Sequence, residues 1–146
     1  EHMIHLDVLT AESSVISVDV DSVVVTTLDG QIAILPGHVP LVGVLQPGEL
    51  VVRAGGEETY LAVSGGFLRV TSQRMMVLAD ACERAADIDV ERAELARLRA
   101  EQLLAEKAPE TDAATVEAAL RRSLARLRVA DKYRLRAARR RAQPML

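Results

Sequence analysis

The sequence has little of what small enzymes and secreted domains usually contain. Among 146 residues there is one cysteine, there are three histidines and no tryptophan, and aromatic residues make up 2%. A single Cys82 excludes an internal disulfide and a four-cysteine zinc site, and His2, His5 and His38 offer little for a metal. No apolar run approaches the roughly 20 residues of a membrane-spanning helix. The start of the chain has neither the basic flank nor the apolar core of a signal peptide, so we expect a protein of reducing, cytosolic surroundings.

Recognisable catalytic motifs are missing as well. The chain contains no G-x-x-x-x-G-K-[ST], no G-x-S-x-G and no H-E-x-x-H. Cys82 has no sequence context typical of a reactive thiolate, and we interpret it as a small packed residue. These residues therefore offer little support for an enzyme.

Charge and glycine are divided unevenly along the chain. The formal net charge is −3, yet residues 1–84 carry 11 acids and 4 bases, whereas residues 113–146 carry 2 acids and 10 bases. All eight glycines lie between Gly30 and Gly66. Because glycine punctuates strands and is rare inside helices, this division indicates two architectures joined near residue 85.

Residues 1–84 have the pattern of short strands separated by turns. Apolar and β-branched residues alternate or cluster at 4–8, 18–27, 50–52, 60–63, 67–70 and 75–78. Glycine-containing pairs at 29–30, 36–37, 47–48, 55–56 and 65–66 mark the expected turns. This spacing predicts an antiparallel β-sandwich in which Gly55-Gly56 closes a hairpin.

Residues 85–146 predict an antiparallel α-helical hairpin with a basic tail. Asp87 or Asp89 is expected to cap a first helix that ends near Glu106. The connector surrounds Pro109, and Thr111 or Asp112 is expected to cap the second helix. An apolar stripe on that helix runs through 116, 120, 124 and 127, opposite a small and basic face. The overall fold class is thus α+β, a sandwich followed by a helical hairpin.

Four arginines occupy matching positions on the two helices. Arg92 and Arg99 share a face of the first helix, and Arg122 and Arg126 share a face of the second. Folding the hairpin about Pro109 brings all four near one another. Four guanidiniums at one place suit a polyphosphate, with Glu83 and Asp89 available to a ribose or base. The alternative from spacing alone is a solvated face, paired with neighbouring glutamates.

The remaining bases form a cationic stripe on the second helix and the tail from Arg134 onward. Such a stripe binds nucleic acid, an anionic lipid surface or an acidic protein. Tyr133 is the only aromatic residue nearby, which disfavours base stacking on a single strand. An adaptor that binds nucleic acid or an acidic protein remains the alternative interpretation of the chain.

Ordered motifs in the first 80 residues resemble a known family. They are Gly30 to Leu41 (G-Q-I-A-I-L-P-G-H-V-P-L), Leu45 to Gly48 (L-Q-P-G), Val63 to Leu68 (V-S-G-G-F-L) and Val77 to Asp80 (V-L-A-D). Together they resemble the epsilon subunit of bacterial F-type ATP synthase. The match runs from Ile4 to about Tyr133, and Ala33 departs from the glycine usual in the family.

This resemblance implies a non-catalytic rotor subunit of a proton-translocating ATP synthase, without a catalytic cofactor. Its partners would be the gamma subunit and the c-ring, with Gln31 and His38 as interface residues in a loop from Gly30 to Leu41. It would lie peripherally on the cytoplasmic face of the cell membrane, with no span of its own and no nucleic-acid partner. The hairpin would move into the alpha/beta head and inhibit ATP hydrolysis.

The resemblance also implies ATP as a regulatory ligand between the helices. Ile88, Asp89, Arg92 and Ala93 match an I/L-D-x-x-R-A motif of nucleotide-binding members. Glu83, Arg99, Arg122 and Arg126 stand where those members place further polar contacts. We therefore expect ATP to stabilise the folded hairpin against the inhibitory form.

Overall fold

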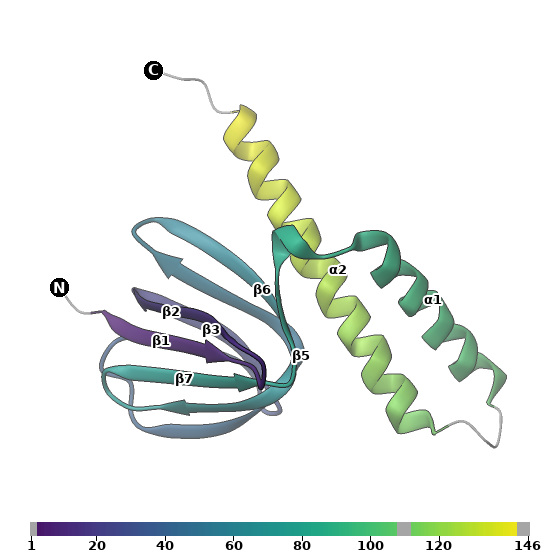
Figure 1. The fold of residues 1–146 in the computed structure, drawn as a ribbon, viewed down its shortest axis with the longest axis horizontal. Coiled ribbons are helices and arrows are strands. Elements are labelled where there is room, and N and C mark those ends of the chain that lie inside the picture. The colour runs from purple at the N-terminus through teal and green to yellow at the C-terminus, as the bar shows by residue number, and fades with distance from the viewer. Residues whose placement is uncertain (1–2, 108–111, 143–146) are drawn as a thin grey trace.

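The computed structural model describes residues 3–107 and 112–142. Strands come first and two long helices follow, joined by one short 3-10 helix (Figure 1). The elements are β1 (Ile4–Leu9), β2 (Ser14–Val20), β3 (Ser22–Thr27), β4 (Gly30–Ile34), β5 (Leu41–Ala54), β6 (Glu57–Val70), β7 (Arg74–Ala79), β8 (Cys82–Arg84), η1 (Ala85–Asp87), α1 (Val90–Glu106) and α2 (Ala113–Ala142).

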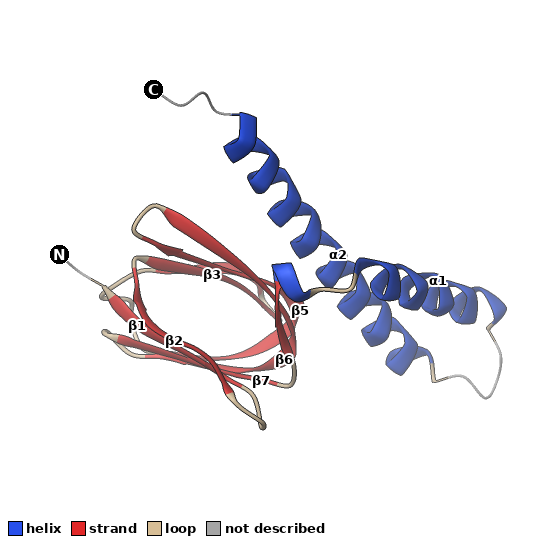
Figure 2. Cartoon of the chain, turned by 45° about the horizontal axis from the view of Figure 1, so that its top comes forward, coloured by secondary structure: helices blue, strands red, loops and turns tan. Residues whose placement is uncertain are grey.

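The strands form a sandwich from one bent sheet, ordered β2-β1-β7-β6-β5-β3-β4, with β8 paired to β6 (Figure 2). The long strands β5 and β6 belong to both layers. Their outer ends pair at Leu41 and Val70 beside β7, and their hairpin ends pair at Ala54 and Glu57 beside β3. Pairing is antiparallel, as predicted, except between β1 and β7, which run parallel. The fold class predicted from the sequence is confirmed.

Two of the expected turns are wrong, and the segment expected as a loop from Gly30 to Leu41 begins as strand β4. Pro47-Gly48 lies inside β5 and Gly65-Gly66 inside β6. At Gly66, φ is +129°, and an added Cβ would lie 2.0 Å from the carbonyl oxygen of Leu78 on β7. Glycine there serves the close approach of two strands within the sheet, which sequence periodicity cannot distinguish from a turn. Gly55-Gly56 does close the β5–β6 hairpin, as predicted.

The sandwich core consists of aliphatic side chains. Ile4, Leu6, Leu50 and Leu61 are completely buried, among valines from β1, β2, β3 and β7. None of the three aromatic residues is buried: Phe67 is 58% exposed on the outer face, Tyr60 is half-buried where β6 packs toward α2, and Tyr133 is 38% exposed on α2 itself. The β-branched residues that give the strands their propensity therefore also form their core.

Both helices begin at aspartates. Asp89 Oδ1 accepts a hydrogen bond from the Arg92 amide at 3.1 Å, which confirms one of the two predicted caps of α1. Asp112 Oδ1 accepts from the Ala114 amide at 3.1 Å at the start of α2. Lys107 ends α1 with φ 51°, while the Pro109 connector and Thr111 lie outside the described residues. The expected basic tail is helical as far as Ala142, because α2 continues along the sandwich.

The hairpin packs through its small residues. On α2 the buried residues are Ser123, Ala125, Val129 and Ala130, whereas Leu124 of the apolar stripe is 37% exposed. Ala93 and Ala100 are the buried residues of α1. Small side chains allow the two helix axes to approach closely. The apolar stripe predicted the helix correctly but does not form its buried face.

Candidate functional site

A polar cavity lies where both helices meet the edge of the sandwich. Its volume is about 360 Å³. Its lining residues come from β6 to β8, from α1 and from α2: Ser64, Ala81, Glu83, Arg92, Ala96, Ala119, Arg122, Ser123 and Arg126. Alanine and serine at the helix contact leave the space, and three arginines supply its positive charge. The cavity therefore suits an anionic ligand better than an apolar one.

Glu83 and Arg126 form a bidentate ion pair at this cavity. Arg126 Nε donates to Glu83 Oε2 at 2.6 Å, and Nη2 donates to Oε1 at 3.0 Å. The two side chains are 37% and 21% exposed, respectively. This pair joins β8 to the middle of α2 and holds one of the three guanidiniums in place. An anion entering the cavity would meet Arg92 and Arg122 without such a carboxylate partner among the described residues.

The four predicted arginines do not all meet at one place. Arg92, Arg122 and Arg126 line the polar cavity, whereas Arg99 lines an adjoining space of about 700 Å³ farther along the hairpin. Arg92, Ala96 and Ala119 border both spaces. The geometry thus brings three of the four guanidiniums together and places the fourth beyond them.

The other predicted site residues, Ile88, Asp89 and Ala93, cap or pack the start of α1. Asp89 caps α1 with its carboxylate, and Ala93 is fully buried one turn into that helix. Ile88 is 8% exposed and packs with Ala85, Val129 and Ala130 against the sandwich. These residues set where α1 begins and how Arg92 is presented to the cavity.

Cys82 lies beside the cavity on β8. Burial raises the pKa of its thiol to about 11. A thiol with such a pKa is almost entirely protonated at neutral pH and is a poor nucleophile. The interpretation of Cys82 as a packed residue agrees with its contact with the sandwich core.

The predicted interface residues lie far from the polar cavity. Gln31 is exposed on strand β4, so the segment expected as a loop from Gly30 to Leu41 is a strand as far as Ile34. His38 follows in the connection to β5, and its Nδ1 lies 2.7 Å from the carbonyl oxygen of Val39. Gln31 lines a cavity that α2 borders from Lys132 to Arg139, whereas His38 does not line this cavity.

Over residues 3–107 and 112–142, no group of three or more His, Cys, Asp and Glu side chains is arranged to hold a metal ion. No helix within those ranges is both long and apolar enough to cross a membrane. The polar side chains that line the polar cavity are three arginines, one glutamate and two serines.

Two family models match consecutive parts of the chain. Residues 3–85 match the β-sandwich domain of the ATP synthase delta/epsilon chain, and residues 86–131 match its long α-helix domain. The chain belongs to the ATP synthase delta/epsilon family. The resemblance inferred from P-G-H and S-G-G-F-L is thus confirmed at the level of the family.

Curated relatives carry the name ATP synthase epsilon chain. One from Dehalococcoides mccartyi is 52% identical over 130 residues, covering 88% of this chain and 93% of the relative. One from Chloroflexus aggregans is 48% identical over 133 residues, covering 91% and 96%. This delta/epsilon chain is therefore similar to those relatives over nearly their whole length.

Two solved structures share the fold. A chain in the Euglena gracilis mitochondrial ATP synthase, in an assembly of OSCP, F1 and c-ring, has a TM-score of 0.77 at 23% identity and covers 92% of this chain and 82% of its own. A chain of the Tetrahymena thermophila mitochondrial ATP synthase central stalk and c-ring has a TM-score of 0.56 at 14% identity, with 89% and 95% covered. At these identities the likeness shows a shared fold and nothing more.

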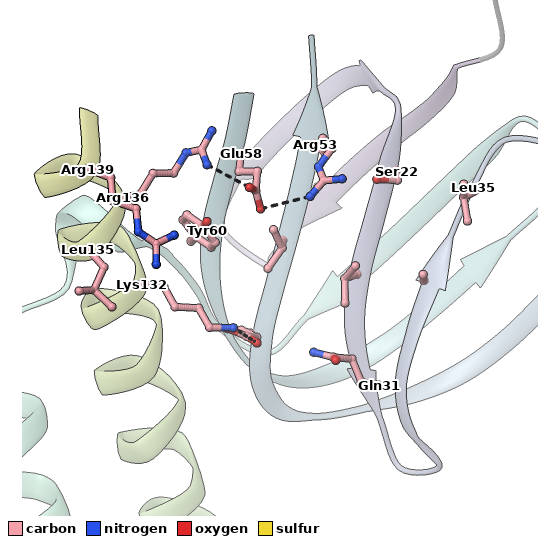
Figure 3. Close-up of a pocket in the computed structure, with 14 residues that line it drawn as sticks. Ser22, Gln31, Leu35, Arg53, Glu58, Tyr60, Lys132, Leu135, Arg136 and Arg139 are labelled. Carbon is pink, nitrogen blue, oxygen red and sulfur yellow. Dashed lines mark hydrogen bonds and ion pairs between the residues drawn. The ribbon is translucent and has the colours of Figure 1, made fainter. Parts of the chain in front are cut away.

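Sequence reasoning missed a second cavity of about 650 Å³, between the end of α2 and the outer face of β3, β4 and β5 (Figure 3). Lys132, Arg136 and Arg139 line it from the helix, and Glu49 and Glu58 line it from the sandwich. The charge asymmetry was the available signal, since an acidic segment and a basic segment in one chain attract each other. The sequence did not reveal which acids meet which bases. These bases lie beyond residue 131, where the family match ends.

Proposed function

We propose that this chain is a non-catalytic rotor subunit of the central stalk of a bacterial F-type ATP synthase. Its sandwich would join a gamma subunit to a c-ring, and its helical hairpin would restrain ATP hydrolysis. The observation that carries the proposal is the small contact between these two parts. Ala62, Ala85, Ile88, Val129 and Ala130 form the buried apolar contact of the hairpin with the sandwich. A contact of this size is compatible with a hairpin that detaches at modest cost.

The outer face of the sandwich supports a permanent protein partner. Val44 pairs with Phe67 and Phe67 with Leu78 across three neighbouring strands. Val42 is 75% exposed and Phe67 58% exposed on this face, next to Met76 and Leu78. A contiguous apolar face of this kind is typical of an interaction surface. We assign it to the gamma subunit, and Gln31 and His38 to contacts near the c-ring, which would hold the chain peripherally at the cytoplasmic face of the membrane.

The polar cavity supports ATP as a regulatory ligand of the docked hairpin. Arg92 from α1 and Arg122 and Arg126 from α2 would bind the triphosphate, with Arg99 extending the positive surface. Glu83 would lose one of its two hydrogen bonds from Arg126, or it would accept a hydrogen bond from the nucleoside. Because these groups converge only while the hairpin is folded, ATP would favour the docked form over the inhibitory one.

The nucleotide site is tested by calorimetry of ATP binding to the full chain, with and without Mg²⁺. Arg92→Ala with Arg122→Ala leaves the Glu83–Arg126 ion pair intact, so the hairpin contact is kept. Each lost charge-assisted hydrogen bond to phosphate should raise Kd on the order of tenfold or more. The matched control is Arg128→Ala with Arg134→Ala, two exposed arginines of α2 that line neither cavity. Equal affinity in all three proteins would disprove the site.

The inhibitory role is tested separately in the assembled complex. A chain ending after Asp87 keeps all eight strands and loses both helices. If the hairpin restrains hydrolysis, ATPase activity should rise severalfold relative to the complex with the full chain, while the sandwich keeps the rotor assembled. Unchanged activity in a complex that contains the shortened chain would refute the inhibition and leave the nucleotide site unaffected.

A further inference from the structure

The last third of α2 contacts the sandwich by charge. Lys132, Arg136 and Arg140 are spaced four residues apart, so they lie along one side of the helix. This segment extends past α1 and runs beside the β5–β6 hairpin, as the yellow end of the ribbon shows (Figure 1). The contact is therefore independent of the polar cavity between the helices.

Each of these three bases pairs with an acid of the sandwich. Lys132 Nζ lies 2.6 Å from Glu49 Oε1, and Arg136 Nη1 lies 3.0 Å from Glu58 Oε1. Arg140 pairs with Glu57 next to the Gly55-Gly56 turn, and its guanidinium lowers the pKa of that carboxyl. The helix thus presents three consecutive turns to three carboxylates on one hairpin (Figure 3 shows the first two pairs).

Two of these side chains are partly removed from water. The Glu49 side chain is 12% exposed, and its Oε2 is buried without a hydrogen-bond partner among the described residues. The same holds for Nε of Arg136, whose side chain is 31% exposed. Removing one partner of a desolvated pair leaves the other charge uncompensated, so these pairs matter more than fully exposed ones.

The ion pairs that lie within a single helix do not distinguish docked from undocked hairpins, unlike the Glu83–Arg126 pair at the polar cavity. Arg97 pairs with Glu94 and Glu101 within α1, and Arg134 pairs with Asp131 within α2. Those pairs persist whenever the helices are formed. The three pairs at the end of α2 exist only while the hairpin lies on the sandwich, where the apolar contact is small.

We propose that Lys132, Arg136 and Arg140 form an electrostatic latch with Glu49, Glu58 and Glu57 that holds the hairpin docked without nucleotide. The latch rests on the proposed mobility of the hairpin but not on ATP binding. It makes docking sensitive to ionic strength, since exposed charges are screened within about 8 to 10 Å at physiological salt. The three bases of the latch thus provide a second means of regulating the hairpin, and all of them follow residue 131, where the family match ends.

The test measures docking in the full chain without ATP. Two labels are placed at the exposed residues Ser13 and Gln102 in a Cys82→Ser background, and the distance between them is followed by spin-label or fluorescence spectroscopy. The latch variant is Arg136→Glu with Arg140→Glu. Each lost pair should lower the ratio of docked to undocked chains about threefold, so both together should lower it roughly tenfold.

Two further proteins make the test specific. Arg128→Glu with Arg134→Glu carries the same net charge change on α2, away from the sandwich acids, and should leave the distance distribution unchanged. Adding Glu57→Arg and Glu58→Arg to the latch variant restores opposite charges and should restore docking.

Raising NaCl from about 0.05 M to about 0.5 M should undock the wild type more than the latch variant. Equal distance distributions in the wild type, latch variant and control would overturn the latch, whereas a failed nucleotide site would leave them unaffected.

Discussion

The sandwich and the hairpin of this chain are held by different kinds of contact. The sandwich buries large aliphatic side chains such as Ile4, Leu50 and Leu61 completely. The hairpin meets the sandwich mainly through alanines, Ile88 and Val129, and through ion pairs that salt can weaken. Burial of a large aliphatic side chain contributes about 1.5–3 kcal/mol, whereas an exposed ion pair contributes at most about 1 kcal/mol.

This difference supports the proposed division of the chain into a permanent part and a movable one. Backbone pairing and large side chains specify the sandwich, so it keeps its form when the hairpin leaves. The helices gain much of their stability from the surface on which they pack, because tertiary packing of one helix face usually contributes more than helix propensity. We therefore expect that a ligand between the helices, or the charge pairs at the end of α2, would shift the hairpin without disturbing the sheet. Substitutions in the sandwich should therefore change the free energy of unfolding by large amounts, whereas substitutions in the hairpin should have smaller effects on stability and docking.

The largest effect is expected at Gly66. Replacing it with alanine places a Cβ 2.0 Å from the Leu78 carbonyl oxygen and 2.9 Å from the Ala79 Cα, at φ +129°. Strand separation and backbone strain together should destabilise the sandwich by about 3 kcal/mol or more. Urea unfolding followed by circular dichroism measures the loss.

Gly43→Ala is the matched control for this prediction. Gly43 on β5 pairs with Leu68 on β6, two residues from Gly66; it has no positive φ, and an added Cβ would lie 3.6 Å from Leu68 Cγ in ordinary contact. Its unfolding free energy should change by less than about 1 kcal/mol. Equal losses in the two variants would contradict the close strand approach as the reason for glycine at position 66.

Much of the fold could be predicted because local pattern and global structure agree. Alternating Ile4, Leu6 and Val8 predicted a strand buried on one face, and all three are completely buried. The glycines at 65–66 were misjudged because a turn and a close strand approach require the same residue. The length of β5 and β6 was missed for the same reason, since Pro47-Gly48 also signals a turn.

The candidate site could be predicted only in part. Helical spacing placed Arg92, Arg122 and Arg126 at one cavity, but it also placed Arg99 there, because a sequence fixes the face of a helix better than the register between two helices. The apolar stripe with Leu124 was expected opposite the small face, and the small face is the buried one. Which acids meet Lys132 and Arg136 depended on the path of α2, which no local pattern encodes.

The smallest effects are expected in the hairpin, at Val129 and Leu95. Val129 is completely buried against the sandwich, so Val129→Ala should weaken docking by about 1–2 kcal/mol through the lost methyl groups. Leu95 on α1 is 68% exposed, so Leu95→Ala removes a larger side chain and should cost no more than about 0.5 kcal/mol. Hydrogen exchange of α2 amides reports docking, and urea unfolding reports the sandwich. If Val129→Ala destabilised the sandwich as much as the hairpin, the two parts would be one cooperative unit, and the distinction between a permanent and a movable part would fail.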